Sequence, residues 1–267
     1  MIDIEKIVCS KLGKGSRFIP KFVFNGLRRF IHEEWINTFL NQEGEKQGAE
    51  WLCDCMKYIN VRLEVSGLEN LPPAGAPPCT FVSNHPLGGA DGVALGSILA
   101  THYNNRVKYL VNDLLMNLHG LAPLCIPVNK TGGQSRSLPA MIKAGFEGQD
   151  HIIMFPAGLC SRLIDGEVKD LPWRKTFIQK SVETQRDVVP IHFYGENSPR
   201  FYRIARWCQR LRLKVNLAMP TLPDELFKAQ GKTFRVVIGK PIAWQTFTKE
   251  RTATEWAAYV REQAYAL

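Results

Sequence analysis

The stretch TFVSNHPLGGADGVAL, Thr80 to Leu95, indicates the fold of this protein. It begins as a short apolar strand, passes through a glycine-containing turn and continues from Asp91 as an apolar helix. A strand that leads through a turn into a helix is the repeating unit of α/β proteins, which place their sites at strand ends. The turn contains Asn84 and His85, so it is also a candidate site.

Similar units follow along the chain. Short β-branched or apolar runs predict strands at Thr80 to Ser83, Val107 to Val111, Leu124 to Val128, Ile152 to Phe155, Val188 to Phe193, Leu213 to Ala218 and Phe234 to Ile238. Helices are expected at Asp91 to Ala100, Leu138 to Ala144, Trp173 to Thr184, Pro199 to Leu211 and Thr252 to Ala264. No repeat or long linker interrupts this pattern. It predicts an α/β fold, a single domain with a largely parallel central sheet flanked by helices.

The first 60 residues have a different, helical pattern. Between Pro20 and Leu40, apolar residues recur at helical spacing while Lys21, Arg28 and Arg29 lie elsewhere on the helix surface. Such a basic amphipathic helix can lie in a lipid interface, or it can cap the domain core. A second helix is expected near Ala49 to Tyr58. We therefore divide the chain into an N-terminal amphipathic helical segment, residues 1–60, which can associate with a membrane, and an α/β domain, residues 61–267.

Composition narrows the class of protein and its partners. The chain has 267 residues, 45% hydrophobic and 22% charged, which excludes a disordered chain and a disulfide-bonded miniprotein. Lys and Arg number 34 against 25 Asp and Glu, a formal net charge of +9. This excess favours an anionic partner: nucleic acid, a negatively charged membrane, an acidic protein or a phosphorylated cofactor.

The cysteines and the N-terminus point to a reducing compartment. The seven cysteines are scattered, and the pair Cys53 and Cys55 has no second pair or histidines at ligand spacing, so we predict no metal site. The N-terminal residues include acids where a signal peptide needs basic residues. Apolar stretches such as Gly92 to Ala100 are shorter than the roughly 18 residues of a spanning helix. Any membrane contact is expected to be peripheral.

His85 and Asp91 are the first candidate catalytic residues. A histidine can abstract a proton near neutral pH, and a carboxylate on its other ring nitrogen fixes the tautomer and stabilises the imidazolium. The pair is two-thirds of a catalytic triad without a serine, which suggests that the substrate's own hydroxyl or amine attacks an acyl donor. Alternatively, Asp91 caps the following helix and His85 is a hydrogen-bonded turn residue.

Three further segments combine with the first into a recognisable order. They are HIIMFPAGLCSR at His151 to Arg162, VVPIHFYG at Val188 to Gly195 and VVIGKPI at Val236 to Ile242, each at a candidate strand. Together the four resemble the lysophospholipid acyltransferase superfamily, which includes the glycerol-phosphate and lysophosphatidate acyltransferases. The resemblance covers Val61 to Ile242.

The resemblance implies roles for individual residues. In the family's first motif, Asn-His is followed by four residues and Asp; the histidine is the general base and the aspartate orients it. These positions look like Asn84, His85 and Asp91, although five residues intervene here. We expect Gly88 and Gly89 to absorb the extra residue. The second motif, a strand followed by a basic residue for the acceptor, looks like Ile126 to Lys130; a solvated Lys130 is the alternative.

The third motif departs from the family. Phe-Pro-Glu-Gly-Thr-Arg-Ser appears here as Phe155, Pro156, Ala157, Gly158, Leu159, Cys160 and Ser161. The glutamate and arginine that help bind glycerol phosphate in the family are absent, with Arg162 as a substitute cation. This variant resembles bacterial acyltransferases that make aminolipids such as glycine and ornithine lipids. Their acceptor carries a carboxylate, which Arg162, Lys175 or Lys130 can pair with.

The sequence therefore predicts an O-acyltransferase. It would move a fatty acyl group from a thioester, acyl carrier protein (ACP) or coenzyme A (CoA), to the hydroxyl of a lyso-aminolipid at the cytoplasmic face of the cell membrane. The predicted substrate-binding residues are Asn84, Lys130, Phe155, Pro156, Gly158, Ser161, Arg162 and Lys175. We expect no cofactor beyond the acyl-ACP or acyl-CoA co-substrate, and an anionic membrane surface rather than nucleic acid as partner.

Alternatives remain open from the sequence alone. One is a 1-acylglycerol-3-phosphate-type acyltransferase. Another is a non-catalytic basic protein on the same fold that binds a membrane or nucleic acid, and a third is a hydrolase. The stretch Ser198 to Lys214, rich in arginine and aromatic residues, can bind RNA, lipid headgroups or ACP, or can be a solvated helix face.

Overall fold

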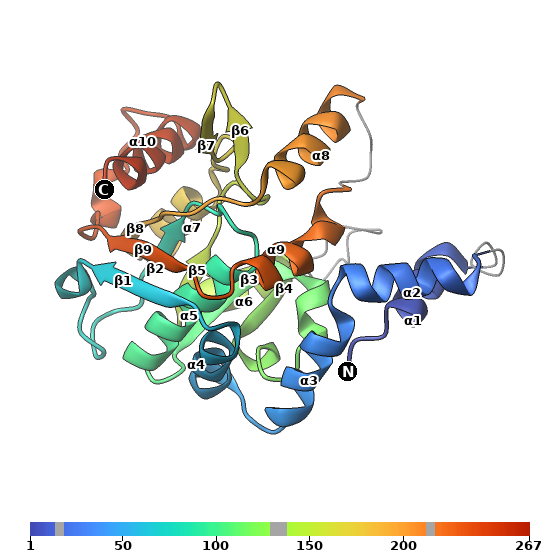
Figure 1. The fold of residues 1–267 in the computed structure, drawn as a ribbon. Helices are drawn as coiled ribbons and strands as arrows, with labels where there is room; N and C mark the ends of the chain where they lie inside the picture. The colour runs from blue at the N-terminus through green and yellow to red at the C-terminus, as the bar shows by residue number, and fades with distance from the viewer. Residues whose placement is uncertain (14–18, 129–137, 212–216) are drawn as a thin grey trace.

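The computed structural model describes residues 1–13, 19–128, 138–211 and 217–267. At its centre is a seven-stranded sheet in the order β1-β9-β8-β2-β5-β3-β4 (Figure 1). The strands are β1 (Arg62–Ser66), β2 (Thr80–Ser83), β3 (Val107–Asn112), β4 (Cys125–Val128), β5 (His151–Met154), β8 (Val188–Phe193) and β9 (Thr233–Ile238). All neighbours pair in parallel except β8 and β9. The predicted largely parallel α/β sheet is confirmed.

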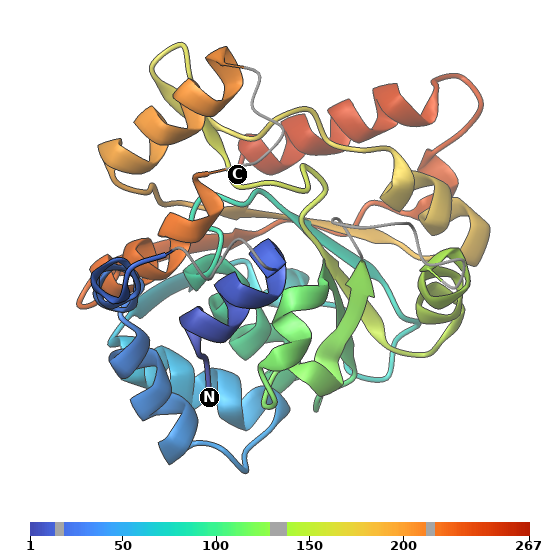
Figure 2. The ribbon, with the colours of Figure 1, turned by 90° about the vertical axis from the view of Figure 1, so that its right-hand side faces the viewer.

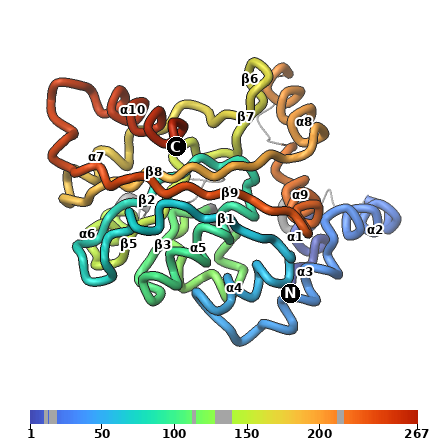
Figure 3. Tube along the Cα trace, turned by 60° about the vertical axis from the view of Figure 1, so that its left-hand side comes forward, coloured from blue at the N-terminus to red at the C-terminus, as the bar shows by residue number. Residues whose placement is uncertain are grey.

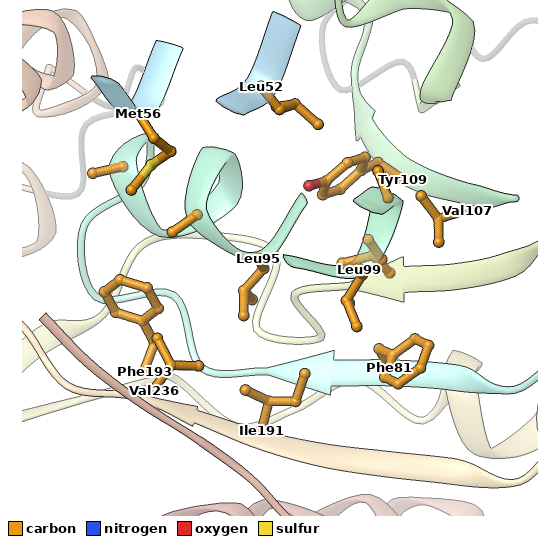
Figure 4. Close-up of a cluster of buried hydrophobic side chains, with 14 of the residues drawn as sticks. Leu52, Met56, Phe81, Leu95, Leu99, Val107, Tyr109, Ile191, Phe193 and Val236 are labelled. Carbon is orange, nitrogen blue, oxygen red and sulfur yellow. The ribbon is translucent and has the colours of Figure 1, made fainter. Parts of the chain in front are cut away.

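Helices cover both faces of the sheet (Figure 3). On one face lie α4 (Gly48–Ile59) and α5 (Ala90–His102); on the other lie α6 (Leu138–Glu147), α7 (Thr176–Thr184) and α10 (Ala253–Tyr265). Successive strand residues point to opposite faces, so Phe81 of β2 packs in one buried cluster and Val82 in the other. Figure 4 shows the first cluster, where Leu99 of α5 lies over Phe81 and Leu95 lies over Ile191 of β8. Burial of β2 on both faces explains its continuous apolar sequence.

The N-terminal segment is helical, as predicted, but it is divided differently. It forms α1 (Ile4–Leu12), α2 (Lys21–Phe30) and α3 (Glu33–Gln42). The single helical stretch expected from Pro20 to Leu40 is wrong, because the chain breaks at His32, whose φ is 54°. The His32 ring stacks on Phe227, with centroids 3.7 Å apart, and its Nε2 lies 2.9 Å from Asp224 Oδ1. These distant contacts fix a bend that local periodicity does not indicate.

A smaller layer lies beyond the carboxyl end of β8. It contains the antiparallel hairpin β6 (Arg162–Ile164) and β7 (Glu167–Lys169), and the helices α8 (Pro199–Arg210) and α9 (Leu222–Lys228). Residues of this layer, with Cys160, form a third buried cluster. Short 3₁₀ helices occur at Leu68–Asn70, Asp113–Asn117, Ala122–Leu124, Met219–Thr221 and Trp244–Thr246. The strand predicted at Leu213 to Ala218 falls mostly outside the described residues, and its last two residues lie in a turn.

Candidate active site

The candidate site lies where β2 ends and α5 begins. Strand β2 stands in the middle of the sheet between β5 and β8, and the loop of residues 84–89 leads from it into α5. Across this loop His85 Nδ1 lies 3.0 Å from Asp91 Oδ2. The His85 side chain is 18% exposed and that of Asp91 is fully buried. The fold therefore joins a solvent-accessible imidazole to a buried carboxylate.

Hydrogen bonds hold the Asp91 carboxylate in place. Its Oδ2 accepts from the Leu87 amide at 2.9 Å and the Gly88 amide at 3.2 Å, and its Oδ1 accepts from the Gly92 amide at 2.9 Å. Burial favours the protonated acid, but the charge and hydrogen bond of His85 and the loop amides outweigh it, so the pKa of Asp91 lies below its ordinary value. An ionised Asp91 accepts from Nδ1–H and leaves the other ring nitrogen free to take a proton.

One glycine absorbs the extra residue in this loop. Gly88 has a φ of 75°, in the left-handed region that favours glycine. Gly89 has a φ of −149°, outside the left-handed region. The turn at Gly88 brings its own amide and that of Leu87 onto the carboxylate six residues after His85. The longer spacing between His85 and Asp91 is thus compatible with direct contact.

The loop after β5 packs against this pair. The Phe155 ring stacks on the His85 imidazole, with centroids 4.0 Å apart and planes at 25°. The Gly158 amide donates to the Phe155 carbonyl at 2.9 Å, which closes a tight turn. Ala157 and Cys160, which replace the charged residues of the family motif, are both buried. Burial raises the pKa of the Cys160 thiol to about 12, so it is no thiolate nucleophile at neutral pH.

Asp170 connects the two loops. Its Oδ1 accepts from the His85 amide at 3.2 Å and from Ser161 Oγ at 2.6 Å, and its Oδ2 accepts from Trp173 Nε1 at 2.8 Å. Its own amide donates to the Tyr265 hydroxyl of α10 at 2.7 Å. The side chain is almost completely buried, which raises the pKa of the carboxyl even though Ser161 and Trp173 oppose the shift.

Asp170 was not among the residues predicted from the sequence. It stands in the segment Leu163 to Trp173, outside the motifs that carry the resemblance. Its two partners within the motifs, Ser161 and His85, are 9 and 85 positions away. The only local signal is Trp173, three residues on, whose indole needs an acceptor if it is buried.

Three predicted binding residues have their polar groups engaged within the protein. The Asn84 side chain is buried and pairs with the Phe193 backbone, accepting at 2.7 Å and donating at 2.9 Å. Ser161 donates its hydroxyl to Asp170 and its amide to the His85 carbonyl at 2.8 Å. Arg162 Nη1 donates to the Cys160 carbonyl at 2.5 Å. These contacts shape the loops beside His85, and direct substrate contact stays a prediction.

The other predicted residues differ in position. The Pro156 carbonyl accepts from the Arg174 amide at 3.1 Å, which places the start of α7 beside the second loop. Gly158, at a φ of 70°, lies close to the Arg174 guanidinium. Lys175 stands at the N-cap position of α7 and is exposed, and its side chain has no partner among the described residues. Lys130 lies outside the described residues.

An open pocket of about 240 Å³ borders the His85 loop. Asn84 and Pro86, which flank His85 in sequence, form one wall, and β7 with the end of β8 forms another. Its lining mixes aromatic and charged side chains, including His192, Tyr194, Tyr265, Glu167 and Lys169. Burial lowers the pKa of His192 to about 4, so its imidazole is neutral at physiological pH. A pocket of this kind can hold a small polar group beside the site.

Comparisons with known proteins identify a family and two relatives. A family model described as acyltransferase matches residues 6–267. A lyso-glycine lipid O-acyltransferase from Phocaeicola vulgatus is 57% identical over 267 residues, covering 100% of this chain and 95% of the relative. A protein of the same name from Bacteroides thetaiotaomicron is 54% identical and covers 100% and 97%.

A solved structure shares the fold. The 1-acyl-sn-glycerophosphate acyltransferase from Thermotoga maritima aligns with a TM-score of 0.52 over 89% of this chain and 92% of its own. The sequences are only 15% identical, so this likeness supports the architecture alone.

Proposed function

This chain belongs to the acyltransferase family, and from that premise we propose that it transfers a fatty acyl group from a thioester to the hydroxyl of a lyso-glycine lipid. The observation that carries the proposal is the 3.0 Å contact between His85 and the fully buried Asp91 at the end of β2. The acceptor is taken from the two relatives above 50% identity, which are both named lyso-glycine lipid O-acyltransferase. The absence of the family's motif glutamate and arginine supports an acceptor other than glycerol phosphate.

The chemistry follows from the pair. With Asp91 ionised and bound to Nδ1–H, the other nitrogen of His85 takes the proton of the acceptor hydroxyl as its oxygen attacks the thioester carbonyl. Asp91 stabilises the imidazolium that forms. The tetrahedral intermediate then collapses as the carbon–sulfur bond breaks, and His85 returns its proton to the thiolate. The products are the ester and a free thiol.

Backbone amides would stabilise the oxyanion of that intermediate. The amides of Leu87, Gly88 and Gly92 already donate to Asp91, so oxyanion donors have to come from other N–H groups. The donor thioester is proposed to be acyl-ACP or acyl-CoA, and the site of action the cytoplasmic face of the membrane. Peripheral attachment is supported by the basic net charge. No helix among the described residues is long and apolar enough to cross a bilayer.

The test is acyl transfer by purified protein with an N-(3-hydroxyacyl)glycine acceptor and acyl-ACP or acyl-CoA. We expect ester formation, and a loss of roughly 10³-fold in kcat/KM for His85→Ala. His102→Ala, an exposed histidine at the far end of α5, is the matched control and should keep full activity. Turnover by folded His85→Ala at the wild-type rate would refute the mechanism. A preference for lysophosphatidate would favour the glycerol-phosphate alternative.

A further inference from the structure

Helix α8 presents an unusual surface to solvent. Its buried face, Phe201, Tyr202, Ala205 and Cys208, packs in the third core cluster or beside it. The opposite face carries Arg203, Arg206, Trp207 and Arg210, all exposed. The Trp207 side chain is 70% exposed, the largest exposure of any described tryptophan, and Leu211 directly after the helix is 62% exposed. An indole in water at the centre of three arginines serves no packing role within the described chain.

The charges on this face are not neutralised within the described residues. Arg203, Arg206 and Arg210 have no carboxylate partner there, and α8 has no acidic residue. Arg200, on the side of α8 near α2, differs: it pairs with Asp224 at 3.0 Å and lies over the Phe30 ring at 4.7 Å. The fold therefore uses the first arginine of the helix to join α8 to α2 and α9, and leaves the other three available to an external anion.

Helix α8 is connected to the candidate site through packed side chains. It follows the carboxyl end of β8 and lies with α2 on the side of the molecule seen at the right in Figure 1 and facing the viewer in Figure 2. Phe201 and Tyr202 share a buried cluster with Cys160, and Cys160 Sγ lies against Gly88 of the His85 loop. A surface that binds through α8 is thus one side-chain layer from the catalytic loops.

We propose that the exposed face of α8, Arg203, Arg206, Trp207 and Arg210, docks the protein on an anionic bilayer surface. Arginine guanidinium groups pair with lipid phosphates, and tryptophan prefers the boundary between headgroups and acyl chains. An acidic protein would also match the charges of the three arginines. The indole at their centre favours a bilayer instead, because a bilayer has charged headgroups at its surface and apolar acyl chains directly beneath them. The inference rests on the proposed function in one respect: the lyso-lipid acceptor resides in the same membrane.

The test is sedimentation of the full chain with vesicles, in the absence of substrate. We expect binding to phosphatidylcholine vesicles that contain phosphatidylglycerol and little binding to phosphatidylcholine alone, with a decrease as salt rises. Arg206→Gln/Arg210→Gln should lower the partition coefficient roughly tenfold or more, and Trp207→Ala by a similar factor. All three side chains are exposed, so the variants should fold.

Matched controls lie on other surfaces. Lys240→Gln/Lys249→Gln removes the same charge from two exposed residues, and Leu68→Ala removes an exposed apolar side chain. Both should bind like wild type. The proposal would be overturned if the control variants lost as much vesicle binding as the α8 variants. It would also be overturned if the α8 variants bound vesicles like wild type but no longer bound purified ACP. Acyl transfer measured in neutral detergent micelles separates the proposed function from the proposed docking surface. If the wild-type protein is inactive in micelles but the α8 variants still lose vesicle binding, the proposed function fails and the docking surface stands.

Discussion

The loops after β2 and β5 are neighbours at the carboxyl ends of two adjacent strands, yet they contribute different properties to the candidate site. The first supplies the titratable pair His85 and Asp91 and holds it with backbone amides. The second is apolar: Phe155 stacks on the imidazole, and Ala157 and Cys160 are buried. Family members place charged acceptor-binding residues in the second loop. Under the proposed mechanism, proton transfer would depend on the first loop and headgroup recognition on other residues, so the same reaction could serve a different acceptor.

The largest effect should come from the first loop. Asp91→Asn would keep the size of the side chain but remove the charge that holds the Nδ1 proton and stabilises the imidazolium. We expect kcat to fall roughly 10³- to 10⁴-fold with a small change in KM. Steady-state kinetics with the glycine-lipid acceptor measure it. If Asp91→Asn retained wild-type kcat, the first loop would no longer be the site of proton transfer.

Asp170 tests whether the two loops depend on one support. Asp170→Asn replaces one carboxylate oxygen with an amide that cannot accept, so one of the donors from His85, Ser161 or Trp173 loses its partner in a buried site. We expect kcat to fall roughly 10- to 100-fold. Asp165→Asn, in the exposed turn of the β6–β7 hairpin, should be neutral.

If Asp170 positions the two loops, the kinetics of Asp170→Asn should differ from those of a variant that is only less stable. The loss should appear in kcat rather than KM, and should exceed any loss expected from the measured change in thermal stability. A parallel decrease in folded fraction and activity would instead assign Asp170 to stability alone.

The contact between the loops can be tested at adjacent glycines. Gly88→Ala places a methyl group against Cys160 and Leu222 at a backbone φ that alanine disfavours, costing about 1–3 kcal/mol. We expect roughly tenfold lower activity and a lower melting temperature. At Gly89 the nearest atom to an added methyl is Leu226 Cδ1 at 3.8 Å, so Gly89→Ala should be tolerated. Equal behaviour of the two variants would show that the loops are not tightly coupled.

The sequence predicted the middle of the central sheet well because strands β2, β5 and β8 are buried on both faces. The bounds of β2 and β8 match the prediction, since continuous β-branched and apolar runs have few other structures available. The resemblance to the lysophospholipid acyltransferases is likewise confirmed at the level of family and fold. The catalytic roles of His85 and Asp91 stay predictions, now with a geometry in which they can act.

Features set by distant contacts were not predictable in this way. The bend at His32 depends on Phe227 and Asp224, and the role of Asp170 depends on His85 and Tyr265. Helices α1 and α9 and the β6–β7 hairpin were also missed. These elements are short, and they pack on neighbours that the sequence does not place.

The smallest expected effect concerns the stability of the sheet rather than the chemistry of the loops. His151 lies at the opposite end of β5 from the second loop, and its Nδ1 accepts from the Cys79 amide at 3.1 Å. Burial, with the charges of Arg186 and Arg106, lowers the pKa of His151 to about 4.

The sign of the pH effect follows from this pKa. An unfolded histidine has a pKa of about 6.5, so between about pH 6.5 and pH 4 the unfolded chain binds a proton that the folded chain excludes. The stability from His151 is complete above that window and is lost as pH falls through it. From pH 7 to pH 5 the free energy of unfolding should decrease by about 1–2 kcal/mol, measured by urea denaturation. In His151→Asn, whose amide oxygen can still accept from Cys79, that decrease should shrink; an unchanged slope would place the acid-sensitive group elsewhere, with buried His192 the next to test.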